Sequence, residues 1–231
     1  MDEKEIIKKF LFEGSLEEQK EKFKIAWDIW ESFDSIRENM RKELASEIVK
    51  QLNSKEFTDF LKERDYEMAN LELFETKGKF GYPIKIFKRS WKTDQVKVPL
   101  FYALEFLRGQ SPYFLDLTMG IRKQDSLNPF RGNWQNSESE LSSEQKNTLK
   151  EIILLLEDEF KTKWNVSDWW IAFCSFDSYG DNWTMWKREF YEKFFTEKGV
   201  EEAAQFYVSQ FKKLIEVTET ALDKFIHSFN L

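Results

Sequence analysis

Apolar side chains recur at spacings of three and four along the first part of the chain, at Ala26, Ile29, Phe33, Ile36, Met40, Leu44 and Ile48. This period is typical of one face of an α-helix, so it predicts a long helix over 16–48. Ser15 and Glu18 have the spacing of a capping box at its start. Asn53 predicts a second N-cap and a helix through about Lys62. Residues 1–70 are therefore expected to be helical.

Between residues 71 and 123 the apolar positions alternate with polar ones. The alternation is clearest in two runs, Val98 to Phe106 and Tyr113 to Ile121. A period of two is typical of strands with one buried face, and the turn residues 108–111 between the runs predict an antiparallel hairpin. We expect further strands over 82–91 and 71–76. The block is interpreted as a β meander with one apolar face.

The rest of the chain returns to helical spacing after a polar loop over 124–141. A helix is predicted to begin at Ser142 or Ser143, and an apolar run predicts a buried strand over 169–176. Asp181 is expected to cap a helix that ends at Gly199, the glycine typical of a helix C-terminus. Residues 142–231 are thus expected to be helical with one strand.

The last predicted helix, over 200–229, has apolar residues at alternating spacings of four and three. This rhythm permits a coiled-coil seam with a second chain, and so a homo-oligomer through the C-terminal helix. We favour packing against the long helix of 16–48 in the same chain. The whole pattern predicts a single α+β domain over 1–231, with an antiparallel sheet of four or five strands packed against long N- and C-terminal helices.

Composition narrows the class of protein. Hydrophobic residues make up 41% of the 231 residues and aromatic residues 17%, which excludes a disordered chain. The longest apolar runs are too short to span a bilayer, and the charged N-terminus lacks the apolar core of a signal peptide. The single cysteine, Cys174, has no partner for an internal disulfide and lies in an apolar run, so we expect an inert buried thiol. We expect a cytoplasmic protein without a membrane segment.

The residue inventory excludes several kinds of catalytic site. His227 is the only histidine, so triads and zinc sites that need several His or Cys residues are disfavoured. Glycine-rich phosphate-binding motifs are missing from the sequence. An enzyme built from this chain would therefore depend on carboxylates, Lys, Arg or Tyr, together with a metal bound by oxygen ligands.

The net charge of −7 hides an uneven distribution. Residues 1–75 and 136–231 each carry a net charge of −7, whereas residues 76–135 carry 11 basic and 4 acidic side chains, a net charge of +7. Cations and aromatic rings on a sheet are what a single-stranded nucleic acid needs, because phosphates bind the cations and bases stack on the rings. The predicted ligand-binding residues are Lys85, Lys88, Arg89, Trp91, Arg122, Arg131 and Trp134. The competing interpretation is that these cations protect sheet edges or neutralise the acidic helices.

Two carboxylate sets offer an alternative, a Mg²⁺-dependent nuclease. The first is Asp65 with Glu75 and Lys77. The second is Glu105 with Asp116, because a turn centred near Gly109 would place Glu105 opposite Phe114 and Asp116 diagonally beside it. Pairing of Glu105 and Asp116 with Lys85, Arg89 or Arg122 is the ordinary alternative to catalysis for the second set.

Three segments of the chain, VPLFYALEF at 98–106, YFLDLTMGIRK at 113–123 and WNVSDWWIAF at 164–173, suggest a family. Their order, after a helical region, resembles the C-terminal half of bacterial PD-(D/E)XK nuclease-superfamily proteins found near mobile elements or defence genes. The resemblance covers about residues 20–190. The family's catalytic core has no counterpart here, because the Asp-Gln pair at 94–95 falls in a turn. The resemblance therefore implies an accessory part that binds a partner or nucleic acid.

These observations lead us to expect a non-enzymatic binding module that uses the basic sheet against nucleic acid or an acidic protein, without a cofactor. The nuclease with Mg²⁺ is one alternative. The other is a protein–protein adaptor or immunity-type inhibitor acting through the acidic helices, at Glu17, Glu18, Glu21, Asp28 and Glu31. Those acids are otherwise explained as a solvated helix face.

Overall fold

The computed structural model describes residues 3–71, 74, 83–91, 100–108, 115–123, 134–135, 141–180, 183 and 187–228. The chain divides into two compact units, Met1–Glu43 and Leu44–Leu231. The boundary lies within helix α2 (Leu16–Leu52), so one helix contributes residues to both units. The sequence pattern led us to expect one domain over 1–231, because it shows no linker at this position.

The first unit is a helical hairpin made of α1 (Glu3–Phe12) and the part of α2 that precedes residue 44. The predicted capping box is confirmed. The backbone N–H of Ser15 donates to Glu18 Oε2 at 2.7 Å, and the Ser15 hydroxyl accepts from the Glu18 N–H at 3.4 Å. The Gln19 side chain donates to two carbonyl oxygens of the preceding turn, at 2.9 and 3.0 Å. These bonds satisfy backbone groups that helix ends leave unpaired, so they fix the turn between the helices.

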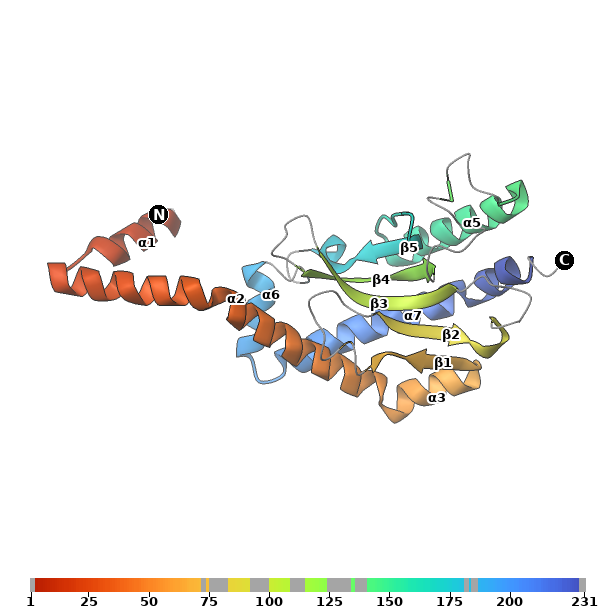
Figure 1. The fold of residues 1–231 in the computed structure, drawn as a ribbon, viewed down its shortest axis with the longest axis horizontal. Coiled ribbons are helices and arrows are strands. Elements are labelled where there is room, and N and C mark those ends of the chain that lie inside the picture. Colours follow the sequence, from red (N-terminus) through yellow and green to blue (C-terminus); the bar gives the residue numbers. More distant parts are fainter. Residues whose placement is uncertain are drawn as a thin grey trace. The chain divides into compact units, whose positions relative to one another are not determined.

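The second unit contains one antiparallel sheet with the strand order β1–β2–β3–β4–β5 (Figure 1). Its strands are β1 (Tyr66–Ala69), β2 (Ile84–Lys88), β3 (Leu100–Arg108), β4 (Leu115–Lys123) and β5 (Trp170–Ser175). The predicted antiparallel meander is confirmed. The first strand begins earlier than the predicted 71–76, because Asp65 takes a left-handed φ of 60° and turns the chain into the sheet directly after the preceding helix.

The β3–β4 hairpin has a different register from the predicted one. Glu105 lies opposite Thr118, and the last pair joins Arg108 to Leu115. The predicted pairing of Glu105 with Phe114 is therefore wrong, because Arg108 still pairs with Leu115 and so belongs to β3. Asp116 lies opposite Leu107, which keeps it diagonally beside Glu105 as predicted.

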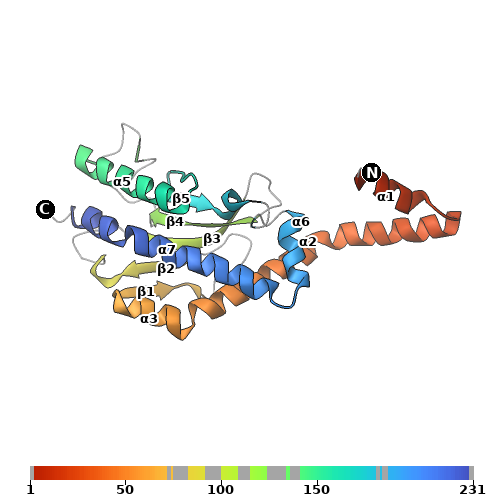
Figure 2. The same ribbon diagram turned by 180° about the vertical axis from the view of Figure 1, so that it is seen from behind.

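Helices cover one face of the sheet, which we call the inner face. Figures 1 and 2 show α5 and α7 side by side on it. The described helices of this unit are α3 (Lys55–Glu63), α5 (Ser143–Phe160), α6 (Arg188–Glu192) and α7 (Gly199–His227), with short 3-10 turns η1 (Arg89–Trp91), η2 (Phe176–Tyr179) and η4 (Lys193–Phe195). The predicted start of α5 is confirmed by a capping box between Ser142 and Gln145. None of the helices in the described ranges is both long and apolar enough to cross a membrane.

The core lies between the inner face and these helices. From α7 it receives Tyr207, Phe211, Leu214, Ile215, Leu222 and Phe225, and from α5 Leu149, Ile152 and Leu156, all buried. The buried Tyr102 hydroxyl on β3 accepts a hydrogen bond from Thr218 Oγ1 at 3.0 Å. The apolar seam of α7 is thus filled within this unit, as the favoured interpretation of packing within the same chain requires, and the homo-oligomer through this helix stays a prediction.

The helix partner of α7 also differs from the predicted one. Its main helix neighbour is α5, and from α2 the second unit contains only the part after residue 43. There the Gln51 side chain donates to the Glu201 carbonyl oxygen at 3.0 Å. Gly199 begins α7 instead of ending a helix. A Cβ at this position would overlap the Lys193 carbonyl group, so a close backbone approach explains this glycine.

Candidate functional site

The sheet face opposite α5 and α7, the outer face, holds three of the described candidate residues, Lys85, Glu105 and Arg122. Strand alternation places on it Lys85, Phe87, Phe101, Ala103, Glu105, Thr118, Gly120, Arg122, Trp170 and Phe173. Among these, Phe101, Ala103 and Trp170 are buried and form an apolar cluster separate from the main core, with Phe87 and Phe173 packed against it. The predicted combination of cations and aromatic rings on one sheet face is therefore present.

Arg122 and Glu105 form an ion pair along the outer face. Arg122 lies opposite Phe101 and Glu105 lies opposite Thr118, so the two side chains meet across the intervening pair of Ala103 and Gly120. A Cβ at Gly120 would come within 2.8 Å of Phe173 Cα and 2.9 Å of Trp170 Cε3. The small residues at this pair leave room for the arginine and for strand β5.

Glu105 is a buried carboxyl group with an exposed fraction of 1%. Burial raises its pKa from the ordinary 4.5 to about 7, although the positive charges of Arg122 and Lys85 act in the opposite direction. Its Oε1 atom has no hydrogen-bond partner among the described residues, and the same is true of the buried Ser175 hydroxyl. The site therefore holds a carboxyl group that is able to gain or lose a proton near neutral pH.

The cations of the outer face lie against aromatic rings. The Lys85 ammonium is 4.6 Å from the centroid of Phe101, and the Arg122 guanidinium is 5.6 Å from that of Trp170. Such contacts are favourable because the ring face is electron-rich. Lys85 and Arg122 thus lie on the outer face as predicted, but the guanidinium of Arg122 is already in contact with the Glu105 carboxyl group.

Lys88 and Trp91 were predicted to contact a ligand, and the structure places both against α7. The Lys88 ammonium pairs with Asp223 and lies 2.7 Å from Glu219 Oε1. Trp91 is buried, and its Nε1 donates to Asp223 Oδ1 at 2.7 Å. Burial alone would lower the pKa of Lys88, but the hydrogen bonds to Asp223 and Glu219 outweigh it and raise this pKa. Both side chains thus fasten the sheet to its own acidic helix, and a ligand contact by either of them stays a prediction.

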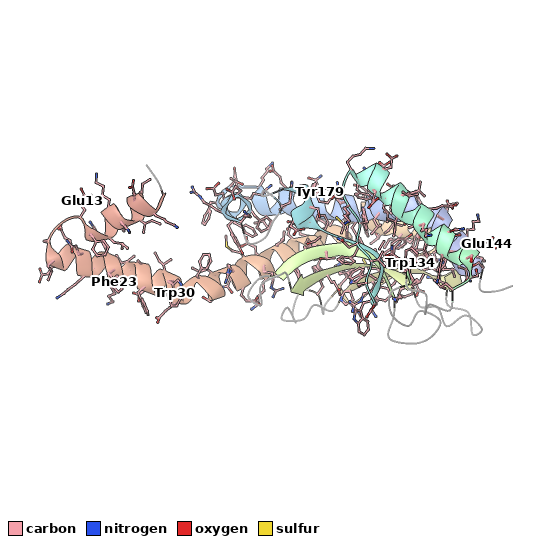
Figure 3. The ribbon with its side chains drawn as sticks, turned by 90° about the horizontal axis from the view of Figure 1, so that it is seen from above. Glu13, Phe23, Trp30, Trp134, Glu144 and Tyr179 are labelled. Atoms are coloured by element: carbon pink, nitrogen blue, oxygen red, sulfur yellow. The ribbon has the colours of Figure 1, made fainter. Side chains whose placement is uncertain are left out.

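Arg89 is exposed next to β1. Its Nε lies 2.9 Å from Glu67 Oε1 and 3.9 Å from Asp65 Oδ1. The structure thus places Asp65 beside a cation, at the turn before β1. Trp134, the other predicted stacking residue, is completely buried, and its Nε1 donates to the Ile171 carbonyl oxygen at 3.0 Å (Figure 3). Its ring belongs to the core of the second unit, and stacking of Trp134 on a ligand stays a prediction.

The remaining predicted residues are Glu75, Lys77 and Arg131, which lie outside the described residues. Asp116 is described through its backbone in β4. Within the described ranges, no group of three or more His, Cys, Asp or Glu residues is arranged to hold a metal ion. The nuclease with its Mg²⁺ ion stays a prediction. Cys174 is buried as expected, and burial raises the pKa of its thiol to about 11.

The helical hairpin carries an exposed apolar surface that the sequence pattern did not predict. Large apolar side chains project from α1 and α2, and two of them, Phe23 and Trp30, are labelled in Figure 3. We call this surface the hairpin face, and its members are Ile6, Ile7, Phe10, Phe12, Leu16, Phe23, Ile25, Trp27, Ile29, Trp30, Phe33 and Ile36, all exposed. The feature of the sequence that indicates this surface is the spacing of three and four between apolar residues, which predicted a helix face buried in the core.

The predicted acidic residues lie on the same hairpin. Glu17, Glu18, Glu21, Asp28 and Glu31 are all exposed. They share the unit with basic residues, so the first 43 residues contain 12 acidic and 9 basic side chains, a net charge of −3.

Comparisons with protein-family models, curated proteins and solved structures find no match to this chain.

Proposed function

We propose that this chain is a protein-binding adaptor whose interaction surface is the hairpin face. The observation that carries the proposal is the exposure of twelve large apolar side chains within one helical hairpin, with Trp30 exposed to 70%. The largest apolar patch of a monomeric protein is typically about 300–600 Å² and is often functional. A dozen half-exposed Ile, Leu, Phe and Trp side chains present on the order of 1,000 Å² or more. Covering such a surface with an apolar surface of another protein is favourable, because it removes apolar area from water.

The composition of the hairpin face supports a protein as its ligand. Aromatic residues are enriched at protein interfaces, where a few of them supply most of the binding energy. Three aromatic rings of the hairpin face form a row along α2. The ring centroids of Phe23 and Trp27 lie 6.1 Å apart, and those of Trp27 and Trp30 lie 5.3 Å apart. The 12 acidic and 9 basic side chains of residues 1–43 give a net charge of −3, which disfavours a polyanion as the ligand.

Binding of nucleic acid or an acidic protein by the basic sheet stays a prediction and ranks second. Three of its five predicted cations, Lys88, Arg89 and Arg122, form ion pairs with carboxylates of the same chain. A polyanion would have to compete with these carboxylates. The contact between the Lys85 ammonium and the Phe101 ring shows a cation and an aromatic side chain together on the outer face, which supports this second function.

Photo-crosslinking in cells that produce the full chain tests the adaptor. A photoreactive phenylalanine analogue replaces Trp30 in one variant and Phe195, which is exposed to 83% in the second unit, in the control. We expect discrete protein adducts from position 30 and a much weaker, diffuse signal from position 195. Equal labelling at the two positions, or adducts that contain lipid or nucleic acid in place of protein, would contradict the proposal.

A further inference from the structure

We infer that the protein bound by the hairpin face is a second copy of this chain. This inference rests on the proposed function, because it names the partner of the same surface. Two hairpins would place their apolar faces against each other and form a bundle of four helices, α1 and α2 from each copy. A two-fold symmetric contact of this kind uses the same patch on both copies, so the patch needs to complement only itself.

The exposed apolar area is sufficient for a stable dimer. The part of the hairpin face on α2, from Leu16 to Ile36, exposes on the order of 1,000 Å². A stable protein interface buries about 800 Å² on each partner. The contributions of α1, through Ile6, Ile7, Phe10 and Phe12, come in addition. One partner hairpin is therefore enough to cover the surface, without a second kind of protein.

The distribution of apolar residues around α2 favours a bundle over a two-helix seam. At about 100° per residue, the apolar positions of the hairpin face on α2 cover roughly 200° of the circumference. A two-stranded coiled coil buries a narrower stripe, whereas a helix in a bundle contacts more than one neighbour. The α1 helix of the same copy is present, and Phe23, Trp27 and Trp30 are still exposed. The uncovered part of the face is therefore available to the helices of a second copy.

The charges of the hairpin favour a second copy of the chain over a membrane or a nucleic acid as the ligand of the hairpin face. Helices that lie on membranes have polar faces rich in Lys and Arg, and nucleic acids require a basic surface. The hairpin instead has 12 acidic and 9 basic side chains, both signs being distributed along its length. A net charge of −3 gives weak repulsion between two copies, and oppositely charged side chains are available at the rim of a symmetric contact.

Sedimentation of the purified full chain over a hundredfold range of concentration tests the inference. We expect a species of twice the chain mass that dissociates on dilution. Trp30→Lys should weaken the self-association by at least about thirtyfold, because it places a charge at the centre of an apolar interface. Trp30→Ala, which retains helix propensity, should have the same direction of effect with a smaller magnitude. Far-UV circular dichroism should be unchanged in both, because Trp30 is exposed in the single copy.

The matched control is Phe195→Lys, which makes the same kind of change at an exposed aromatic residue of the second unit. This variant should self-associate like the unmodified chain. A monomer at every concentration would overturn the inference, as would a dimer that Trp30→Lys leaves intact. A monomer that crosslinks to other proteins through position 30 overturns self-association and leaves the adaptor function standing. A monomer that binds anionic vesicles, or that shields its tryptophans against its own second unit, overturns both.

Discussion

The protonation of Glu105 depends on two opposing effects. Its carboxyl group is buried on the outer face, and desolvation favours the neutral form, whereas Arg122 and Lys85 favour the charged form. Desolvation is the larger effect, so the pKa rises to about 7. The folded chain therefore retains a proton at pH 6 that the unfolded chain has already released. This difference makes folding depend on pH.

We expect Glu105→Gln to remove one component of the pH dependence of stability. Between the ordinary pKa of 4.5 and the folded value of about 7, the folded state binds one more proton at this residue than the unfolded state. Its contribution is therefore complete below pH 4.5 and is lost as the pH rises through 7, a total of about 3 kcal/mol. The measurement is the free energy of unfolding in urea at several pH values, as the difference between the original chain and the variant. Parallel curves for the two proteins would contradict the argument.

At the residue scale, the sequence allowed part of this site to be predicted. Alternation along 98–106 and 113–121 placed Glu105 and Arg122 in paired strands, and Arg122 was among the cations expected to neutralise a sheet carboxylate. The partner of Lys88 was not predictable. Asp223 lies 135 residues further along the chain, and helix periodicity does not show which sheet residue a helix acid will meet. The burial of Trp91 was not predictable for the same reason, because it depends on that helix.

At the scale of elements, one acidic turn of α7 fastens the end of β2 and the following η1 turn to the helix layer. Asp223 accepts from Trp91 Nε1 and pairs with Lys88, which is exposed to 12%. Glu219, one turn earlier, holds the same ammonium and lies 3.5 Å from Arg64 Nε. Removing the acceptor of a buried hydrogen-bond donor destabilises a fold more strongly than removing one partner of an exposed ion pair does. This contact therefore determines how firmly β2 and η1 are held on α7.

We expect Asp223→Ala to lower the free energy of unfolding by about 2 kcal/mol, because Trp91 loses its acceptor and Lys88 loses one of two partners. Asp223→Asn should lower it less, since an amide oxygen still accepts from the indole. The control is Asp158→Ala, whose partner Lys161 lies 2.7 Å away on the exposed side of α5. That change should leave the free energy of unfolding almost unchanged, because exposed ion pairs contribute little to stability. Urea unfolding measures all three, and equal effects of Asp223→Ala and Asp158→Ala would refute the proposed role of this contact.

Most elements could be predicted because their own residues determine them. The capping boxes at Ser15 and Ser142 and the alternating runs of β3 and β4 are local signals, and both kinds are confirmed. The errors occurred where tertiary contacts decide. Glycine is typical of helix C-termini, yet Gly199 begins α7. It is a glycine because the backbone of Lys193 passes too close for a side chain. A local pattern indicates that a glycine is needed without indicating which contact requires it.

At the scale of the whole molecule, α2 carries one continuous apolar pattern with two different environments. Leu44, Ile48 and Leu52 are completely buried in the second unit, whereas Phe23 and Trp30 are exposed in the first. The sequence predicted a single core-facing stripe, because the period of an apolar face is the same whether its partner belongs to the same chain or to another. The exposed part of the stripe is the feature that the adaptor proposal explains.

Amide hydrogen exchange along α2 provides a test at this scale, with the intact chain. Amides of 44–52 should exchange slowly at any protein concentration, because their apolar side chains are buried within one copy. Amides of 20–36 should exchange quickly in dilute solution and more slowly as the concentration rises, since association covers the hairpin face and stabilises its helices by mass action. Trp30→Lys should remove the concentration dependence for 20–36 and leave 44–52 unchanged, while Phe195→Lys should alter neither. Protection that is uniform along α2 and independent of concentration would show that the two parts of the helix are stabilised in the same way within one copy.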